Sequence, residues 1–302
     1  MSAQPPVLQP GNPPLFVSIL NTEYFEIESA IVGARFAVWV TTPPGYGADP
    51  NRSYPAIYMP DGNLATALTA PINFMEDLIE PKLPYVQVSV GYTMNDMASI
   101  MILRNRDLLP PGEPIHPATD ALIDQFVATG GMTADQGAFM KSSLRNTHAD
   151  AFLKFLTDEL HPQISAKYKI DESACGLFGF SLGGLFAAYA ALKRPSLFTR
   201  IGAGSPGMLT AQSAIFQILE QEVQAGADHS GRFLHITANE LEITKPGYYQ
   251  IIGTNFARFI NMLGAAPLKG LQFTSHVIPY ETHSTGPTAA FSSFLRTLYA
   301  AK

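Results

Sequence analysis

The chain has 302 residues, of which 46% are hydrophobic, and a formal net charge of −6 at pH 7. That length allows a sizeable core, and an acidic chain without a Lys/Arg-rich run lacks the basic surface that sequence-independent nucleic-acid binding requires. The chain contains no run of about 18 apolar residues, so no membrane span is predicted. Its single cysteine, Cys175, excludes an intramolecular disulfide and zinc sites built from several thiolates.

The N-terminal segment, residues 1–14, is proline-rich and carries no charged side chain. It lacks the basic start and apolar centre of a secretory signal. The sequence therefore predicts a disordered lead-in, a single domain over residues 15–302 and a cytoplasmic protein. It does not indicate the oligomeric state.

Two extended segments open the domain, Phe16 to Ile27 and Ile31 to Thr42, and their β-branched and aromatic residues predict an antiparallel pair of strands. Short apolar runs then alternate with helical patterns. Further strands are predicted over Pro55–Met59, Tyr85–Val90, Ala174–Phe178, Thr199–Ala203, Arg232–Thr237 and Leu271–Ile278. Helices are predicted over 67–80, 149–167, 182–193, 210–225, 245–263 and 286–300. This alternation predicts an α/β fold, with a mostly parallel sheet and helices on both faces.

One stretch interrupts the alternation, from Arg104 to Asn146. It is too long for an ordinary loop. We expect a partly helical insertion over the site, a candidate lid rather than a separate domain. Its apolar side chains either line an acyl pocket or form a small core of their own; they are Leu108, Leu109, Ile115, Leu122, Phe126 and Met132.

The most informative motif is Gly179-Phe180-Ser181-Leu182-Gly183-Gly184, between a predicted strand and a predicted helix. A Gly-x-Ser-x-Gly turn holds its serine on a sharp bend and exposes the hydroxyl at the edge of the sheet. Glycine is favoured on both sides because a Cβ would crowd the bend. The motif predicts Ser181 as the nucleophile of an α/β-hydrolase.

A serine nucleophile needs a histidine base and an orienting carboxylate, and in α/β-hydrolases the order is Ser, Asp or Glu, His. Four histidines follow Ser181. His235 and His276 fall inside predicted strands, and His229 precedes a strand, at the wrong end of the sheet. His283 follows the last strand, so we predict it as the base.

The acid is expected just after the strand 232–237, where Glu240 and Glu242 occur. We predict Glu242, with Glu240 as the alternative. The oxyanion needs two N–H donors. One is expected from Leu182, which follows the nucleophile, and the other from Asn63 after the strand 55–59, with Gly62 as the alternative.

The chain resembles the serine-esterase family of α/β-hydrolases that includes enterobactin-type siderophore esterases and relatives of esterase D. The matching segments are Tyr58-Met59-Pro60-Asp61-Gly62-Asn63, Arg106-Asp107-Leu108, Phe152-Leu153-Lys154-Phe155-Leu156, Glu159-Leu160-His161-Pro162-Gln163-Ile164, Gly179 to Gly184, Arg194-Pro195-Ser196-Leu197-Phe198, Gly204-Ser205-Pro206 and Asn239-Glu240-Leu241-Glu242. The resemblance implies the α/β-hydrolase fold, ester hydrolysis, a triad of Ser181, Glu242 and His283, and no metal or organic cofactor.

Four residues are predicted to bind the substrate, Gly62, Arg106, Ser205 and Gly207. The family often has bulk after Ser205-Pro206, so Gly207 is expected to open the pocket near the acyl group. Phe180 stands where such esterases often carry histidine. Siderophore esterases act on large anionic chelates, and no concentrated basic surface is predicted here. We therefore expect small to medium neutral esters.

Three functions follow from these residues. The first is a carboxylic-ester hydrolase that forms an acyl-enzyme on a small-molecule ester. The second is an acyltransferase on the same triad, and a siderophore trilactone esterase is a variant of the first. The third is a binding module on a hydrolase scaffold, since the fold does not fix the function.

Overall fold

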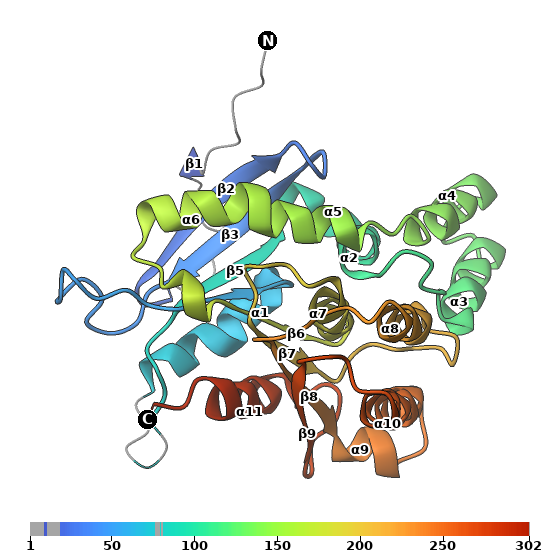
Figure 1. Cartoon of the computed structure of the whole chain (residues 1–302). Coiled ribbons are helices and arrows are strands. Elements are labelled where there is room, and N and C mark those ends of the chain that lie inside the picture. The colour runs from blue at the N-terminus through green and yellow to red at the C-terminus, as the bar shows by residue number, and fades with distance from the viewer. Residues whose placement is uncertain (1–8, 11–18, 76–78, 80, 302) are drawn as a thin grey trace.

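A central sheet organises the molecule (Figure 1). The computed structural model describes residues 9–10, 19–75, 79 and 81–301. Within these residues the sheet has nine strands: β1 (Gln9–Pro10), β2 (Thr22–Ser29), β3 (Ala34–Thr41), β4 (Ala56–Met59), β5 (Val86–Tyr92), β6 (Gly176–Phe180), β7 (Arg200–Gly204), β8 (Phe233–Asn239) and β9 (Gln272–Ile278).

The strand order is β1-β2-β3-β5-β4-β6-β7-β8-β9. The first four strands in this order pair antiparallel, which confirms the predicted pairing of β2 with β3. From β5 to β9 all neighbours are parallel, as predicted. Phe180 pairs with Gly204 and Gly204 with Thr237, so β6, β7 and β8 end at one edge. Residues that follow these strands therefore meet there.

The helices match the predicted alternation, with some shifted bounds. They are α1 (Gly62–Thr69), α2 (Ile100–Leu108), α3 (Pro117–Ala128), α4 (Ala134–Leu144), α5 (Ala149–Lys154), α6 (His161–Lys167), α7 (Leu182–Lys193), α8 (Ala214–Gln224), α9 (Glu240–Thr244), α10 (Gln250–Ala265) and α11 (Pro287–Leu298). A π-helical segment, Phe155–Leu160, joins α5 to α6, so the predicted helix 149–167 is one continuous run.

Two predicted helices have wrong bounds. The helix expected over 67–80 begins at Gly62, because Asp61 adopts a left-handed conformation (φ 59°) that turns the chain directly into α1. Part of its predicted end lies outside the described residues. The helix expected over 245–263 begins only at Gln250, and the separate helix α9 ends at Thr244, because Pro246 and Gly247 lie between them and Gly247 has a φ of 154°.

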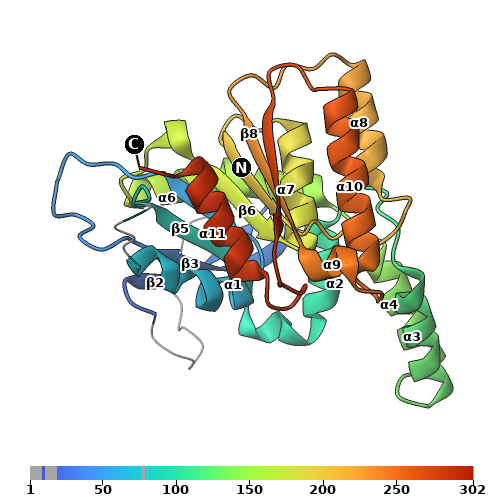
Figure 2. The ribbon, with the colours of Figure 1, turned by 90° about the horizontal axis from the view of Figure 1, so that it is seen from below.

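The helices cover both faces of the sheet. One core packs α5, α6, α7, α8 and α10 against the strands, and a second core packs α11 against the opposite face through Phe291, Phe294 and Leu295. Figure 2 shows α11 and α1 on one side of the strands and α7, α8 and α10 on the other. The strands β4, β5, β6 and β7 are buried almost throughout, which is the arrangement that the run of apolar strands predicts.

The predicted insertion is helical, with α2, α3 and α4 over its length. Helices α3 and α4 form a hairpin that projects from the body of the molecule (Figures 1 and 2). Thr133 caps α4, since its hydroxyl accepts from the Gln136 N–H and the Gln136 side chain accepts from the Thr133 N–H. The hairpin carries its own local signals for folding.

Most of the predicted lead-in, residues 1–8 and 11–14, lies outside the described residues. Gln9 and Pro10 form β1, which pairs with Glu26 and Phe25 of β2. None of the helices in the described part of the chain has the length and apolar character needed to span a bilayer.

Candidate active site

Ser181 lies on a strained turn between β6 and α7. Its backbone has φ 58° and ψ −120°, a combination that non-glycine residues rarely adopt. The glycines around it are needed for space, because a Cβ on Gly179 would lie 2.0 Å from the Gly183 carbonyl oxygen, and a Cβ on Gly184 would lie 2.3 Å from the Gly204 carbonyl oxygen. The close approach of strand and helix thus excludes larger residues, as expected for a nucleophile elbow.

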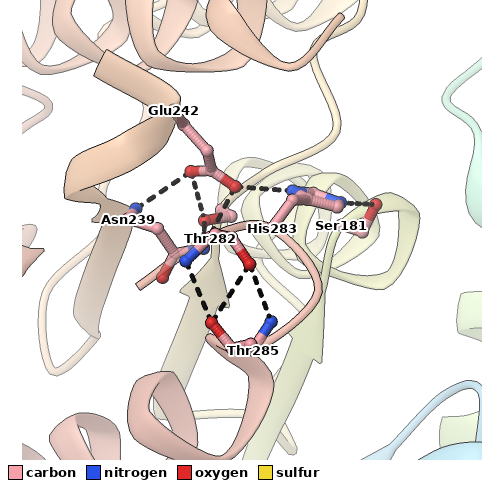
Figure 3. Close-up of polar contacts among 7 residues, drawn as sticks. Ser181, Asn239, Glu242, Thr282, His283 and Thr285 are labelled. Atoms are coloured by element: carbon pink, nitrogen blue, oxygen red, sulfur yellow. Dashed lines mark hydrogen bonds and ion pairs between the residues drawn. The ribbon is translucent and has the colours of Figure 1, made fainter. Parts of the chain in front are cut away.

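His283 reaches this serine from the other end of the sequence. Its Nε2 lies 2.8 Å from the Ser181 Oγ, and its Nδ1 lies 2.6 Å from the Glu242 Oε1 (Figure 3). An ionised carboxylate only accepts hydrogen bonds, so Nδ1 carries the proton and Nε2 is left to accept the Ser181 hydroxyl proton. The three predicted side chains therefore meet in one hydrogen-bonded chain.

The Glu242 carboxylate is buried and fully engaged. Its Oε2 accepts from the Asn239 N–H at 2.9 Å and from the Ser205 hydroxyl at 2.8 Å, and the Asn239 side chain donates to Oε1 at 3.0 Å. Burial alone would raise the pKa of Glu242, but the hydrogen bonds from His283, Asn239 and Ser205 outweigh it and hold this pKa below its ordinary value. Glu242 is therefore a carboxylate at neutral pH.

The loop that carries His283 is braced from both sides. Thr282 and Thr285 exchange hydrogen bonds, each N–H donating to the other residue's hydroxyl at 3.0 and 3.2 Å (Figure 3). Glu240, the alternative acid, does not reach the imidazole through a hydrogen bond; its Oε2 accepts from the Tyr280 N–H at 2.7 Å. Of the two glutamates, Glu242 is the one placed at His283.

Two aromatic rings cover the imidazole, and sequence reasoning assigned neither of them to this task. Tyr249 stacks on His283 with ring centroids 4.1 Å apart and planes 15° apart, and Phe180 lies 5.1 Å away. Tyr249 lies in the loop between α9 and α10, within the first residues of the helix predicted over 245–263. The adjacent Pro246-Gly247 pair was the only signal for a loop there.

Two of the other candidate histidines, His235 and His276, contact hydroxyl groups other than that of Ser181. His235 is 3% exposed, and its ring nitrogens contact the Thr274 and Ser293 hydroxyls at 2.8 and 2.9 Å. His276 contacts the same Ser293 hydroxyl at 3.1 Å. The exclusion of these strand histidines as bases agrees with their positions.

The predicted oxyanion donors differ in their surroundings. Leu182 is the first residue of α7, where an N–H has no acceptor within the helix, and it lines the cavity beside Ser181. Gly207 lines the same cavity, and a Cβ there would lie 3.0 Å from the Leu182 nitrogen. Gly207 therefore keeps the approach to this N–H open.

Gly62 and Asn63 hold α1 against β5 and are not among the cavity-lining residues. A Cβ on Gly62 would lie 2.9 Å from the Val90 backbone. The Asn63 side chain donates to the Tyr92 carbonyl and accepts from the Tyr92 N–H, both at 2.8 Å. The predicted substrate contact of Gly62 is replaced by close backbone packing, and Asn63 as second donor stays a prediction.

Two further substrate contacts were predicted for residues that the structure engages elsewhere. Arg106 forms a bidentate ion pair with the buried Asp107, at 2.6 and 2.9 Å, and does not line the cavity. Ser205 is completely buried and donates to Glu242. The arginine that does line the cavity is Arg104, which is paired with Asp61 at 2.6 and 3.0 Å.

A cavity of about 400 Å³ opens at Ser181. Its walls include five of the six apolar residues of the insertion that sequence analysis named: Leu109, Ile115, Leu122, Phe126 and Met132. The sixth, Leu108, is buried in the main core. The insertion thus lies over the cavity, and its apolar side chains face the space beside the serine. In the described residues, no group of three His, Cys, Asp or Glu side chains is arranged to hold a metal ion.

Known proteins resemble this chain in sequence. Residues 126–238 match the family model described as "Putative esterase". The chain is 29% identical over 171 residues to the ferri-bacillibactin esterase BesA of Bacillus subtilis, and 27% identical over 175 residues to a siderophore enterobactin esterase of Emericella nidulans. Each alignment covers 56% of this chain and 51% or 52% of the relative, so the chain spans about half the length of the curated relatives it matches.

Solved structures resemble it over nearly the whole chain. The siderophore hydrolase EstB of Aspergillus nidulans has a TM-score of 0.74 at 18% identity, over 96% of this chain and 98% of that one. The BES protein of Bacillus cereus has a TM-score of 0.71 at 20% identity, over 96% and 100%. At such identities the likeness shows the fold, and the family match adds the sequence relation. The chain has the α/β-hydrolase fold, and its residues 126–238 match the esterase family model in sequence.

Proposed function

We propose that this protein is a carboxylic-ester hydrolase that works through an acyl-enzyme on Ser181. The observation that carries the proposal is the hydrogen-bonded chain from the Glu242 Oε1 through both nitrogens of His283 to the Ser181 Oγ. A serine hydroxyl attacks an ester only when a neighbouring base removes its proton, and the imidazole is placed to do so.

In the first half of the reaction, the Ser181 Oγ bonds to the ester carbonyl carbon and its proton moves to the His283 Nε2. The carbonyl oxygen becomes an oxyanion, which the Leu182 N–H stabilises with a second donor, for which we propose the Asn63 N–H. The bond to the alcohol oxygen then breaks, and the alcohol leaves with the proton from His283. Glu242 stabilises the imidazolium in between.

In the second half, His283 takes a proton from water, and the resulting hydroxide attacks the acyl carbon. The collapse of this intermediate returns the proton to the Ser181 Oγ and releases the carboxylic acid. The strained backbone of Ser181 and the aromatic rings on His283 keep the reacting groups in place through both halves.

The cavity supports neutral esters of small to medium size as substrates. Its walls are mostly apolar, and the Arg104 charge is already paired with Asp61. A second candidate is a siderophore esterase, because both curated relatives described above are named for that activity. Such a substrate is a large anion, for which the paired Arg104 offers little attraction.

Fluorophosphonate labelling and hydrolysis of p-nitrophenyl butyrate test the proposal. We expect Ser181→Ala to lose labelling and to lower kcat by at least about 10⁴-fold, because the attacking oxygen is removed. Ser173→Ala, which alters an exposed serine before β6, is the matched control and should retain both. Undiminished labelling of purified Ser181→Ala would sink the mechanism.

Competition between two substrate classes decides between the candidates. We expect kcat/KM to be higher for neutral p-nitrophenyl esters than for a metal-free catecholate trilactone. The reverse order, abolished by Ser181→Ala, would establish the second candidate.

A further inference from the structure

The cavity contains one acidic side chain for which the proposed mechanism has no use. Glu113 precedes α3 and lines the cavity, although the residue is only 6% exposed. Carboxyl groups are seldom buried in apolar surroundings without a partner, so a buried one in a cavity wall points to recognition of a ligand.

The protein satisfies one oxygen of this carboxyl. The Ser213 hydroxyl and the Ala214 N–H, at the start of α8, donate to the Glu113 Oε2 at 2.9 and 2.8 Å. Both of these bonds end on the same atom. A carboxyl group has two accepting oxygens, so Oε1 keeps its capacity to accept from a ligand.

Two other polar residues of the cavity wall, Arg104 and His116, are engaged within the protein. The Arg104 guanidinium is held by Asp61, and the His116 Nδ1 accepts from the Ala118 N–H at 3.1 Å. Burial raises the pKa of Glu113 to about 7, since the surroundings disfavour its charged form. The wall thus carries little unpaired charge, and the second oxygen of Glu113 lies among mostly apolar side chains and the neutral polar groups of Asn105, Thr119, Tyr248 and Tyr249.

The cavity lies on the acyl side of the reaction. Leu182 and Gly207, on the side of the oxyanion donor, line it, whereas His283 is not among its lining residues. The leaving alcohol must face the His283 Nε2 to receive its proton. The acyl chain then extends the other way, under the α3–α4 hairpin and toward Glu113.

We propose that Glu113 is a specificity-determining residue that accepts a hydrogen bond from the acyl part of the substrate, so that the preferred esters carry a hydroxyl or amide N–H on an apolar chain. This inference rests on the proposed esterase function. An ester without the donor leaves the Glu113 carboxyl unpaired and desolvated, and it is selected against for that reason.

The test compares p-nitrophenyl octanoate with p-nitrophenyl hydroxyoctanoates that carry the hydroxyl at different carbons. For the best-placed hydroxyl, we expect the wild-type kcat/KM to exceed that for octanoate by about 10-fold or more. In Glu113→Leu the ratio should fall to near one, and in Glu113→Gln it should fall severalfold, since an amide oxygen is a weaker acceptor than a carboxylate.

Glu159→Leu is the matched control. Glu159 is 8% exposed and likewise accepts from a serine hydroxyl, Ser29, and from two backbone N–H groups, but it lies outside the cavity wall. Its substitution removes a comparable buried carboxyl and should keep the wild-type ratio. Should Glu113→Leu fail to fold, Glu113→Gln decides, because an unchanged ratio in that variant overturns the proposal.

Failure of the inference and failure of the esterase function give different results. Wild-type protein that hydrolyses octanoate and every hydroxyoctanoate equally well refutes the role of Glu113 and leaves the esterase intact. Wild-type protein without Ser181-dependent hydrolysis of any of these esters refutes both.

Discussion

Two helices that line the cavity beside Ser181 are built very differently. In α7, every residue from Leu182 to Leu192 is buried, and the helix packs within the main core. In α3, which is described throughout, only Ile123 is buried, and the hairpin with α4 projects from the body (Figure 2). Packing on all sides fixes α7, which follows Ser181. By contrast, few buried side chains hold α3, which covers the cavity.

This difference separates two tasks. The reacting groups need positions fixed to a fraction of an ångström, and the core around α7 supplies that rigidity. The acyl pocket needs a wall whose residues change without loss of the fold, and an exposed hairpin supplies it. Under the proposed function, the reaction and the selection of the acyl chain therefore depend on regions that differ in packing.

The largest expected effect tests the hydrogen-bonded chain at the start of α7. Glu242→Gln should lower kcat by about 10³- to 10⁴-fold, because an amide cannot stabilise the imidazolium as a carboxylate does. Hydrolysis of p-nitrophenyl butyrate measures it. Glu240→Gln changes the first residue of α9, whose carboxylate accepts from the Tyr280 N–H, and should lower kcat by less than about 10-fold. Equal losses in the two variants would remove Glu242 from its proposed role.

Truncation of one phenylalanine on each side sharpens the comparison. Phe186 of α7 is fully buried and packs on Phe152, so Phe186→Ala should lower the free energy of unfolding by about 3–5 kcal/mol. Phe126 of α3 is 47% exposed, and Phe126→Ala should cost about 1 kcal/mol or less while altering the preference for acyl-chain length. Urea unfolding measures the free energy of unfolding of both variants. Similar losses in Phe186→Ala and Phe126→Ala would contradict the proposed difference between α7 and α3.

The last prediction concerns the pH dependence of stability. The pKa of Glu113 rises from 4.5 to about 7 on folding, so between these values the folded protein holds a proton that the unfolded chain has released. Stability from this group is therefore present at low pH and lost as pH rises, by about 2–3 kcal/mol. Other titratable or charged side chains line the same cavity, namely Arg104, His116, Tyr248 and Tyr249. The contribution of Glu113 is therefore isolated by comparing a Glu113 variant with the wild type, and not by the pH dependence of wild-type stability alone.

Glu113→Gln, which resembles the protonated acid, should match the wild type near pH 5 and exceed its stability near pH 8. Urea unfolding at both pH values measures the difference. A constant gap between the two proteins across this range would show that the Glu113 carboxyl does not titrate as described.

The sequence was sufficient for the parts of the molecule that local rules control. The alternation of apolar runs with helical patterns predicted the parallel sheet, and the Gly-x-Ser-x-Gly motif predicted the turn at Ser181. The order of residues after each strand led to Glu242 and His283, since the carboxyl ends of parallel strands share one edge.

Two of the failures have a common cause, which is that side-chain partners come from distant segments. Arg106 is the exception, because its partner, Asp107, is the next residue, and only the burial of that acid depends on the fold. Ser205 adopts a φ of 37° after β7 and turns toward Glu242 instead of the cavity. The stacking of Tyr249 on His283 joins two loops that no local pattern connects.

The Glu242 carboxylate, just after β8, bonds both to the start of α9 and to His283. The Glu242 side chain ties down the first turn of α9 through the Asn239 N–H while its other oxygen grips the imidazole. The glutamate side chain is long enough to make both hydrogen bonds at once. An aspartate is one methylene shorter and would lose either the bond to the Asn239 N–H or the bond to the His283 Nδ1. Replacement of Glu242 by aspartate therefore requires a shift of the backbone between β8 and α9. The length of this side chain thus limits which substitutions the protein can accept here.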